Sequence, residues 1–316
     1  MLKGINYPCD IKKLSAEELK VLAGDIRRLI IDSVASQGGH LASSLGAVEI
    51  CLALHFCMNT PHDTLIFDVG HQTYAHKIIT GRKDQFGRLR QKNGVSGFPN
   101  PDESIYDVYI SGHASTAVSW AQGISEAKRL KGDTTKTVAV IGDGSLSGGM
   151  CFEALNHCGH SQCDILIVLN HNEMSISSSV GALSNYLTKL ISLPIYNRIK
   201  HELEHFLKRL PPFTKRFAGL IKRFEEAMKS LIVPGVFFEE LGFRYFGPLD
   251  GHNLSALIPN IRNILFLAGP KVLHVITQKG KGYKFAEQNA EDFHSAAKFS
   301  VVTGDFSNNQ AVSFST

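Results

Sequence analysis

The sequence predicts an α/β fold built on a doubly wound, mostly parallel sheet with helices on both faces. Two short apolar runs rich in β-branched residues, Thr137–Ile141 and Ile165–Leu169, are separated by a helical stretch, Met150–Cys158. Strand, helix and strand at this spacing form a βαβ unit, and unbroken apolar strands are typical of a parallel sheet buried on both faces. Val272–Ile276 is a further candidate strand of the same kind.

The elements before this unit follow from apolar periodicity. Apolar residues recur at every third or fourth position in Ser15–Ala35, which predicts a helix. Ser15 and Glu18 have the spacing of a capping box at its start. Three further elements are expected, namely helices over Gly46–Cys57 and Ala114–Leu130 and a short buried strand over Thr64–Asp68.

We assign residues 1–304 to one domain that carries an insertion. The segment 177–234 accumulates basic residues, with glutamates that offset part of their charge, and is interpreted as an exposed helical insertion. A surface for nucleic acid or anionic lipid is the alternative, although the interleaved aromatic residues of single-strand-binding surfaces are missing from the segment. Residues 305–316 are polar and aperiodic and are expected to form a tail or the start of a linker.

Composition excludes several classes of protein. A chain of 316 residues that is 43% hydrophobic is too apolar for a disordered protein and long enough to bury a core. The formal net charge of +4 gives no general argument for nucleic acid or a membrane as partner. Neither a membrane-spanning apolar run nor the apolar core of a signal peptide is present, so a cytoplasmic location is expected.

The six cysteines are scattered and form no CxxC pair, so we expect free thiols in a reducing compartment. A metal site on His157, Cys158 and Cys163 is the alternative, but its spacing does not fit a zinc ribbon.

Polar clusters follow three of the apolar runs: Gly142-Asp143-Gly144, Asn170-His171-Asn172 and residues 279–283. Ligands of an open parallel sheet bind beyond the carboxyl ends of its strands, so the clusters are expected to share one site. Glycines let the backbone approach a phosphate closely, and the oxygens of Asp143 and Asn172 suit Mg²⁺. A GDG triplet alone occurs in ordinary turns, but its pairing with an asparagine after the next strand is far more specific.

The stretch Gly142–Ser177, GDGSLSGGMCFEALNHCGHSQCDILIVLNHNEMSIS, has the motif of thiamine diphosphate enzymes and resembles the 1-deoxy-D-xylulose-5-phosphate synthases, which are relatives of transketolase. Other segments resemble that family in the same order along the chain. They are GGHLASSLG (38–46), FDVGHQTYAHKIITGR (67–82), SGHAST (111–116), VGALSNYL (180–187), FEELGFRYFGPLDGHN (238–253) and KGKGYKFAE (279–287). Transketolases share the GGH and GDG elements but not the GPxDGH segment, so the synthases are the closer match.

The resemblance implies roles for individual residues. Mg²⁺ would be held by Asp143, Asn172 and the main-chain carbonyl of Met174. His40 and His294 would face the substrates as catalytic residues, because a histidine pKa near working pH suits proton transfer. Thiamine diphosphate would contact His71, Gly112, His113, Ala114, Gly144, Ser145, Asn172, Lys279 and Tyr283, with Lys279 near the diphosphate.

The reaction that the resemblance implies is the decarboxylation of pyruvate and transfer of the two-carbon unit to glyceraldehyde 3-phosphate, in the synthesis of isoprenoid precursors. Two positions depart from the family's pattern: His171 stands where the family usually has Asp, and Ala114 where Ser is common. Neither is a proposed metal ligand. His252 is interpreted as ordering a turn before a helix.

Members of that family are about twice as long, by what the resemblance implies. Their second half supplies the glutamate that activates the cofactor, an aromatic pocket for its ring and arginines for the acceptor's phosphate. We therefore expect this chain alone to bind the cofactor weakly and to catalyse little, with a C-terminal half in another chain and a homo-oligomer as partners. The alternatives are a subunit of a split transketolase-like enzyme with another acceptor, and a non-catalytic cofactor-binding protein.

Overall fold

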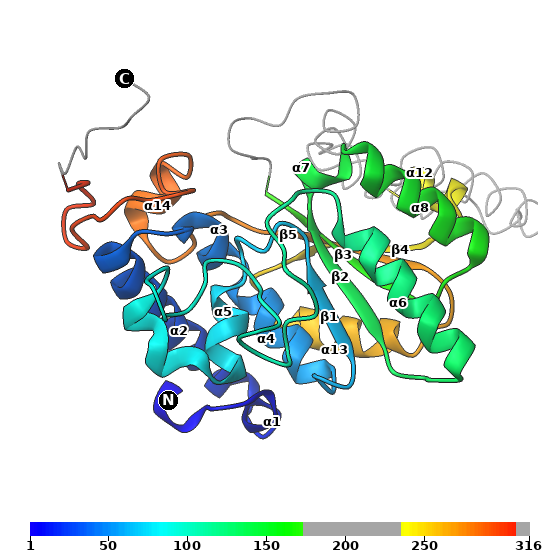
Figure 1. Cartoon of the computed structure of the whole chain (residues 1–316), viewed down its shortest axis with the longest axis horizontal. Coiled ribbons are helices and arrows are strands. Elements are labelled where there is room, and N and C mark those ends of the chain that lie inside the picture. The colour runs from blue at the N-terminus through cyan, green and yellow to red at the C-terminus, as the bar shows by residue number, and fades with distance from the viewer. Residues whose placement is uncertain (173–234, 308–316) are drawn as a thin grey trace, which may run out of the picture.

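The computed structural model describes residues 1–172 and 235–307. In this part of the chain one parallel sheet runs in the order β1-β2-β3-β5-β4 (Figure 1). Its strands are β1 (Thr64–Phe67), β2 (Thr137–Gly142), β3 (Leu166–His171), β4 (Arg244–Asp250) and β5 (Lys271–Ile276). The predicted α/β fold with a parallel sheet is confirmed. The predicted insertion over 177–234 and Met174 lie outside the described residues.

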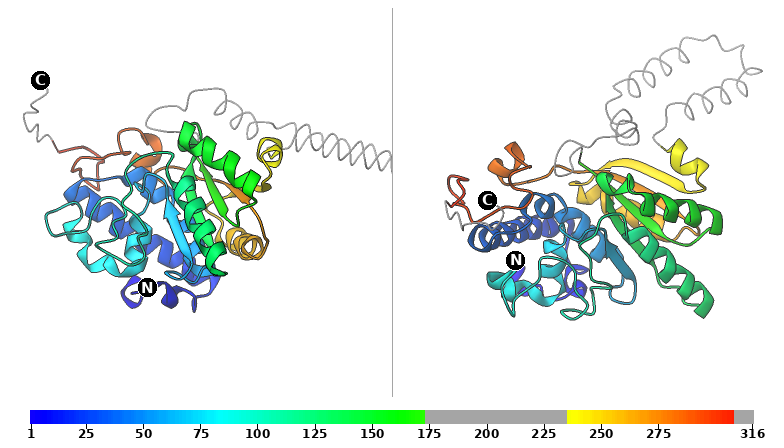
Figure 2. Two further views of the ribbon diagram at one scale, coloured as in Figure 1. Left: turned by 45° about the vertical axis from the view of Figure 1, so that its right-hand side comes forward. Right: turned by 45° about the horizontal axis from the view of Figure 1, so that its top comes forward.

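Helices cover both faces of the sheet. The longer ones are α2 (Ala16–Gln37), α4 (Val48–Cys57), α6 (Ala117–Lys131), α8 (Gly149–Ser161) and α13 (Leu254–Leu265). The short ones are η1 (Leu2–Gly4), α1 (Pro8–Ile11), α3 (Leu41–Gly46), α5 (Tyr74–Lys77), η2 (Ile78–Arg82), η3 (Lys83–Arg88), α7 (Asp143–Leu146), α12 (Val236–Glu240) and α14 (Lys284–Gln288). Figure 2 shows α14 beside α3 in both views, although the two are far apart in sequence.

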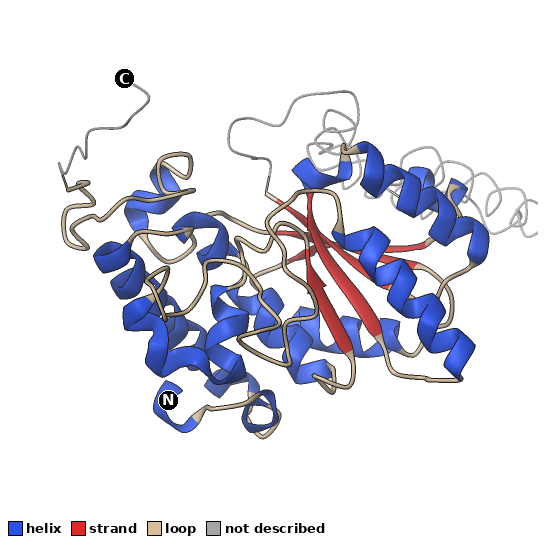
Figure 3. Ribbon diagram, in the orientation of Figure 1, coloured by secondary structure: helices blue, strands red, loops and turns tan. Residues whose placement is uncertain are grey.

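The strands separate two apolar cores, because successive side chains of a strand point to opposite faces. On β2, Val138 and Val140 pack into the core shared with α2, α4 and α13, whereas Ala139 and Ile141 pack into the core shared with α6 and α8. Figure 3 shows the sheet between these helices. Burial on both faces explains why the central strands are continuous apolar runs in the sequence.

Local sequence signals place several elements correctly. The predicted capping box is present: the Ser15 amide donates to a Glu18 carboxylate oxygen at 2.8 Å, and the Glu18 amide donates to the Ser15 hydroxyl at 3.3 Å. The helix predicted over Gly46–Cys57 is α4, which begins at Val48, and the short helix α3 ends at Gly46 just before it.

Strand β4 had no predicted counterpart. It is an edge strand whose residues are mostly exposed, and it contains Gly247 and Pro248, so it lacks the apolar run by which buried strands are recognised. At the C-terminal end, Phe306 forms an antiparallel bridge with Phe299 and its ring centroid lies 4.9 Å from that of Phe293, so the second residue of the predicted tail contacts the domain.

Candidate active site at the carboxyl edge of the sheet

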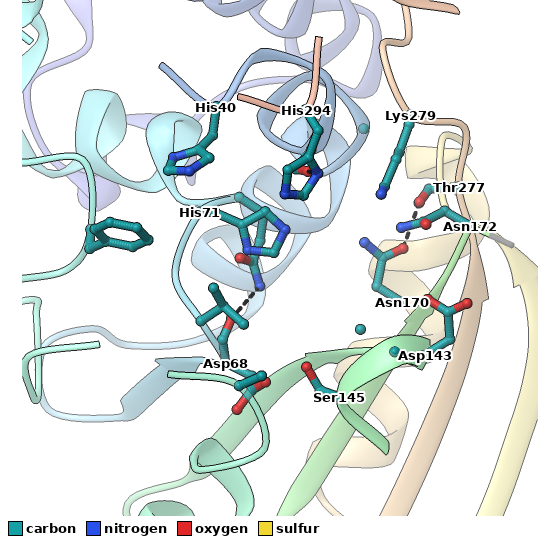
Figure 4. Close-up of a pocket in the computed structure, with 18 of the residues that line it drawn as sticks. His40, Asp68, His71, Asp143, Ser145, Asn170, Asn172, Thr277, Lys279 and His294 are labelled. Carbon is teal, nitrogen blue, oxygen red and sulfur yellow. Dashed lines mark hydrogen bonds between the residues drawn. The ribbon is translucent and has the colours of Figure 1, made fainter. Parts of the chain in front are cut away.

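A cavity of about 520 Å³ opens where the strands end (Figure 4). This volume is typical of pockets for small molecules and cofactors. Register pairs Gly142 of β2 with Asn170 of β3, so the polar residues that follow the two strands emerge side by side. The cavity brings together ten residues singled out in the sequence: His40, His71, Gly112, Ala114, Asp143, Gly144, Ser145, Asn172, Lys279 and His294.

Two predicted cofactor residues do not line this cavity. His113 is exposed, although its neighbours Gly112 and Ala114 are lining residues. Tyr283 is buried, with its ring between 5.5 and 5.8 Å from those of Phe285, Phe293 and Phe299. Its hydroxyl donates to the carbonyl oxygen of Val301 at 3.1 Å. In this structure Tyr283 therefore holds the C-terminal segment in place.

Several lining residues had not been singled out, among them Asp68 and Phe98. Asp68 directly follows β1, so the rule that ligands bind beyond strand ends would have found it. Its carboxylate accepts the amide N–H groups of Ser115, Thr116 and Ala117 at 2.9, 2.9 and 3.0 Å. Asp68 thereby caps α6 and fixes the loop before it against the cavity. Phe98 lies in a loop without any local signal.

Three histidines from distant segments form one wall of the cavity. The ring centroids of His40 and His71 lie 5.9 Å apart, those of His71 and His294 5.1 Å, and those of His40 and His294 6.1 Å. Burial lowers the pKa of His71 to about 3 and that of His40 to about 4, and neighbouring histidines add to both shifts. These rings are therefore neutral at pH 7, and a bound anion would raise their pKa values.

Polar residues at the carboxyl ends of β2, β3 and β5 gather on the other side of the cavity. Figure 4 shows Asp143, Asn170, Asn172, Thr277 and Lys279 there. Burial raises the pKa of the Asp143 carboxyl, against the opposing effect of His171. Burial lowers the pKa of Lys279 to about 8, and the charge of Asp143 opposes this shift. A carboxylate, two amides and a buried ammonium thus share one small space.

His171, the last residue of β3, takes part in a chain of hydrogen bonds across the sheet. Its Nδ1 lies 3.2 Å from Nε2 of His274, and Nδ1 of His274 lies 2.7 Å from the Tyr245 hydroxyl. Its Nε2 lies 3.8 Å from a carboxylate oxygen of Asp143. Burial lowers the pKa of His274 to about 3, so this ring is neutral at pH 7.

The cysteines and the alternative metal site lie within the described residues. The six cysteines are free, as expected. Within residues 1–172 and 235–307, no three or more His, Cys, Asp and Glu residues are grouped so that they could hold a metal ion, so the alternative site at His157 finds no support. The predicted magnesium set is of a different kind, because it includes an amide and a main-chain oxygen. No helix in the same ranges is long and apolar enough to cross a membrane.

The fold is that of the transketolases. The structure of transketolase from Campylobacter jejuni superposes with a TM-score of 0.63 at 18% identity, over 90% of this chain and 41% of that one. Transketolase from Leishmania mexicana gives a TM-score of 0.55 at 16% identity, over 84% of this chain and 37% of that one. Identity at this level supports the fold alone.

Sequence similarity defines the family. The family model of 1-deoxy-D-xylulose-5-phosphate synthase matches residues 2–277, and the chain belongs to this family. The synthase of Caldanaerobacter subterraneus subsp. tengcongensis is 51% identical over 306 residues, which is 97% of this chain and 49% of the relative. That of Alkaliphilus oremlandii is 49% identical over 315 residues, 99% of this chain and 50% of the relative. The chain spans about half the length of these curated relatives.

Proposed function

We propose that this chain provides the diphosphate-binding half of a 1-deoxy-D-xylulose-5-phosphate synthase. It would bind thiamine diphosphate and Mg²⁺ for the decarboxylation of pyruvate and transfer of the two-carbon unit to glyceraldehyde 3-phosphate. The observation that carries the proposal is the placement of Asp143 and Asn172 after two adjacent parallel strands, at one end of a cavity that also contains Lys279. Membership of the synthase family supports the choice of reaction.

The residues present fit a magnesium diphosphate. Asp143 and Asn172 offer the hard oxygen ligands that Mg²⁺ takes, and Met174 would add a main-chain oxygen. Lys279 offers a cation for the diphosphate. A Cβ atom at Gly112 or Gly142 would meet no atom within 4 Å, so the backbone at these lining positions faces open space that a ligand can approach.

The cavity wall formed by His40, His71 and His294 fits a substrate that carries oxygen atoms and negative charge. Nδ1 of His40 and Nδ1 of His71 are buried and have no hydrogen-bond partner among the described residues. Buried polar atoms without partners are rare in folded proteins, and a ligand that pairs with them explains their presence. Gly144, Ser145 and Ala114 line the same cavity as the proposed metal ligands and would complete the contacts to the cofactor.

When bound, thiamine diphosphate supplies a carbon nucleophile and a place for the electron pair that the departing carboxylate leaves behind. The role of this chain is to hold and orient the cofactor, its metal ion and the substrates. Asp143 and Asn172 would fix the metal, and Lys279 would offset the charge of the diphosphate. His40 and His294 would face the keto acid and the acceptor as proton donors or acceptors, because the approach of an anionic substrate raises their lowered pKa values toward neutrality.

The proposed activity belongs to an assembly of this chain with a second half, which the relatives have and which the present sequence does not include. That half, in this or another chain, would add the glutamate, the aromatic pocket and the arginines implied by the family resemblance. A homo-oligomer and a cytoplasmic location are part of the same proposal and rest on the sequence.

The proposal is tested by calorimetric titration of thiamine diphosphate into the chain in the presence of Mg²⁺. Asp143→Ala should abolish magnesium-dependent binding, because a carboxylate ligand is lost. Glu153→Ala, at an exposed position on α8, is the matched control and should bind as the unaltered chain does. Equal affinity of the Asp143→Ala and unaltered chains would show that the metal is held elsewhere. The purified chain alone should form negligible product from pyruvate and glyceraldehyde 3-phosphate, and robust turnover would contradict the need for the other half.

A further inference from the structure

The loop that carries Lys279, residues 277–282, is anchored by its backbone. The Thr277 amide donates to the carbonyl oxygen of His171 at 2.9 Å, and the Gly280 amide donates to that of Ala42 at 2.8 Å. Gly280 has φ +75°, and a Cβ there would lie 2.3 Å from the backbone of Ala286. The loop therefore has little room to shift, and the groups that hold it decide where the Lys279 ammonium lies.

Two side chains hold the loop on either side of Lys279. Before it, the Gln278 amide donates to Nε2 of His252 at 2.8 Å. After it, Nε of Arg27 donates to the carbonyl oxygen of Lys281 at 2.9 Å. The two anchors come from segments far apart in the sequence, α2 and the turn before α13. Neither lines the cavity.

The carboxylate of Glu49, on α4, joins these two anchors. It accepts two hydrogen bonds from the guanidinium of Arg27, at 2.7 and 2.6 Å, and lies 3.0 Å from Nδ1 of His252. Glu49 is buried, which by itself raises its pKa, but the hydrogen bonds from His252 and Arg27 outweigh burial and hold this pKa below its ordinary value. Arg27, Glu49 and His252 thus form one charged, hydrogen-bonded unit, here called the loop clamp.

The contacts of His252 determine its tautomer. A backbone amide can only donate, so Nε2, which accepts from Gln278, carries no proton. The other ring nitrogen faces a carboxylate, which can only accept, so Nδ1 carries the proton. The ring is therefore neutral and joins an acceptor on one side to a donor on the other. Neither Lys nor Arg at this position could accept the Gln278 amide.

We propose that His252 is a positioning residue for Lys279, acting through the loop clamp. The ring transmits the fixed position of Glu49 to the Gln278 amide, one residue before Lys279, and Arg27 does the same two residues after it. The proposal deepens the proposed function, since it rests on that function for what the Lys279 ammonium contacts, but not for the clamp itself.

Two substitutions of similar size separate the two ring nitrogens. In His252→Gln, the side-chain oxygen can reach the place of Nε2 and still accept the Gln278 amide. In His252→Asn, the side-chain NH₂ can take the place of Nδ1 and still donate to Glu49, but nothing accepts from Gln278. A residue that merely fills space would make the two variants alike. A residue that positions the loop makes them differ.

The first measurement needs no cofactor. Amide hydrogen exchange at Gln278 and the ring nitrogen shifts of His252 are followed by NMR on the whole chain, with thermal unfolding as a check on folding. We expect the ring proton on Nδ1, and slow exchange at Gln278 in the unaltered chain and in His252→Gln. In His252→Asn, exchange should be about tenfold faster, the effect of losing one hydrogen bond. A ring proton on Nε2, or equal exchange in the two variants, would overturn the proposal.

The second measurement connects the clamp to the ligand. Thiamine diphosphate with Mg²⁺ should bind about tenfold more weakly to His252→Asn than to His252→Gln. Once Lys279→Met has removed the ammonium, His252→Asn should cause no further loss, because the two changes act on the same contact. Additive losses would overturn the positioning role. If Lys279→Met alone leaves binding unchanged, the proposed contact of Lys279 with the diphosphate is wrong. The hydrogen-exchange result would still test whether His252 holds the loop.

Discussion

Two groups of buried histidines differ in how their ring nitrogens are used. In the cavity group, His40, His71 and His294, Nδ1 of His40 and Nδ1 of His71 have no partner among the described residues. In the core group, Nδ1 of His55 lies 2.9 Å from the Thr60 hydroxyl and Nε2 lies 2.9 Å from Nδ1 of His76. Nε2 of His76 in turn lies 2.8 Å from the Asp107 carboxylate.

The difference shows that a lowered pKa alone does not mark a functional histidine. Burial lowers the pKa of His55 and His76 just as it lowers that of His40 and His71. What separates the groups is pairing. The core group ends in Asp107, which also accepts two hydrogen bonds from Arg82, at 2.6 and 2.9 Å, so its polar atoms stabilise the fold. The cavity group keeps acceptors and donors for a ligand.

The largest loss of stability should come from removing Asp107, the carboxylate with which the core group ends. Asp107→Ala leaves the buried guanidinium of Arg82 without its bidentate partner, which should lower the free energy of unfolding by about 3–5 kcal/mol. His40→Gln, in the cavity group, should lower it by about 1 kcal/mol or less, because no hydrogen bond to Nδ1 is lost. Urea unfolding followed by circular dichroism measures both. Similar losses of unfolding free energy in Asp107→Ala and His40→Gln would contradict the view that only the core group stabilises the fold.

A second prediction uses pH on the cavity group. The pKa of His40 is about 4 and that of His71 about 3 in the folded chain, against 6.5 in an unfolded one. Below pH 6.5 the unfolded chain binds protons that the folded chain does not, so stability is fully present above this pH and falls as the pH is lowered toward 4. Each of the two residues should contribute a slope of up to about 1.4 kcal/mol per pH unit.

This slope is checked by urea unfolding at several pH values. His71→Gln should make it smaller by the contribution of one proton. A slope that His71→Gln does not alter would mean that His71 titrates normally in the folded chain.

The smallest effects come from removing one hydroxyl partner in each group. Thr60→Val leaves Nδ1 of His55 buried and unpaired and should cost about 1–3 kcal/mol of stability. Ser43→Ala removes the hydroxyl 3.3 Å from Nδ1 of His294, but this ring borders the cavity, where water can replace the hydroxyl, so about 0.5 kcal/mol or less is expected. Differential scanning calorimetry would resolve the two. A larger loss of stability for Ser43→Ala than for Thr60→Val would mean that the histidine hydrogen bond at the cavity stabilises the fold more than the one in the core.

Much of the fold could be predicted because the central strands are buried on both faces. Such strands must be apolar throughout, which is why β2, β3 and β5 stand out in the sequence. Strand β4 could not be found in this way, since an edge strand needs no apolar run and tolerates Gly247 and Pro248. The loop residues around His113 show a limit of motif reading, since Gly112 and Ala114 line the cavity and His113 between them does not.

Sequence alone places Asp143 and Asn172 together, because adjacent parallel strands end at the same edge of the sheet and the residues after them must emerge there. It could not show that His40, His71 and His294 meet, that the ring of Phe98 lies 5.1 Å from that of His40, or that His252 reaches Gln278. These contacts join segments tens to hundreds of residues apart, and their geometry depends on how helices and loops pack around the sheet. Whether a buried ring nitrogen finds a partner is decided by that packing, and the partner distinguishes the core histidines from those of the cavity.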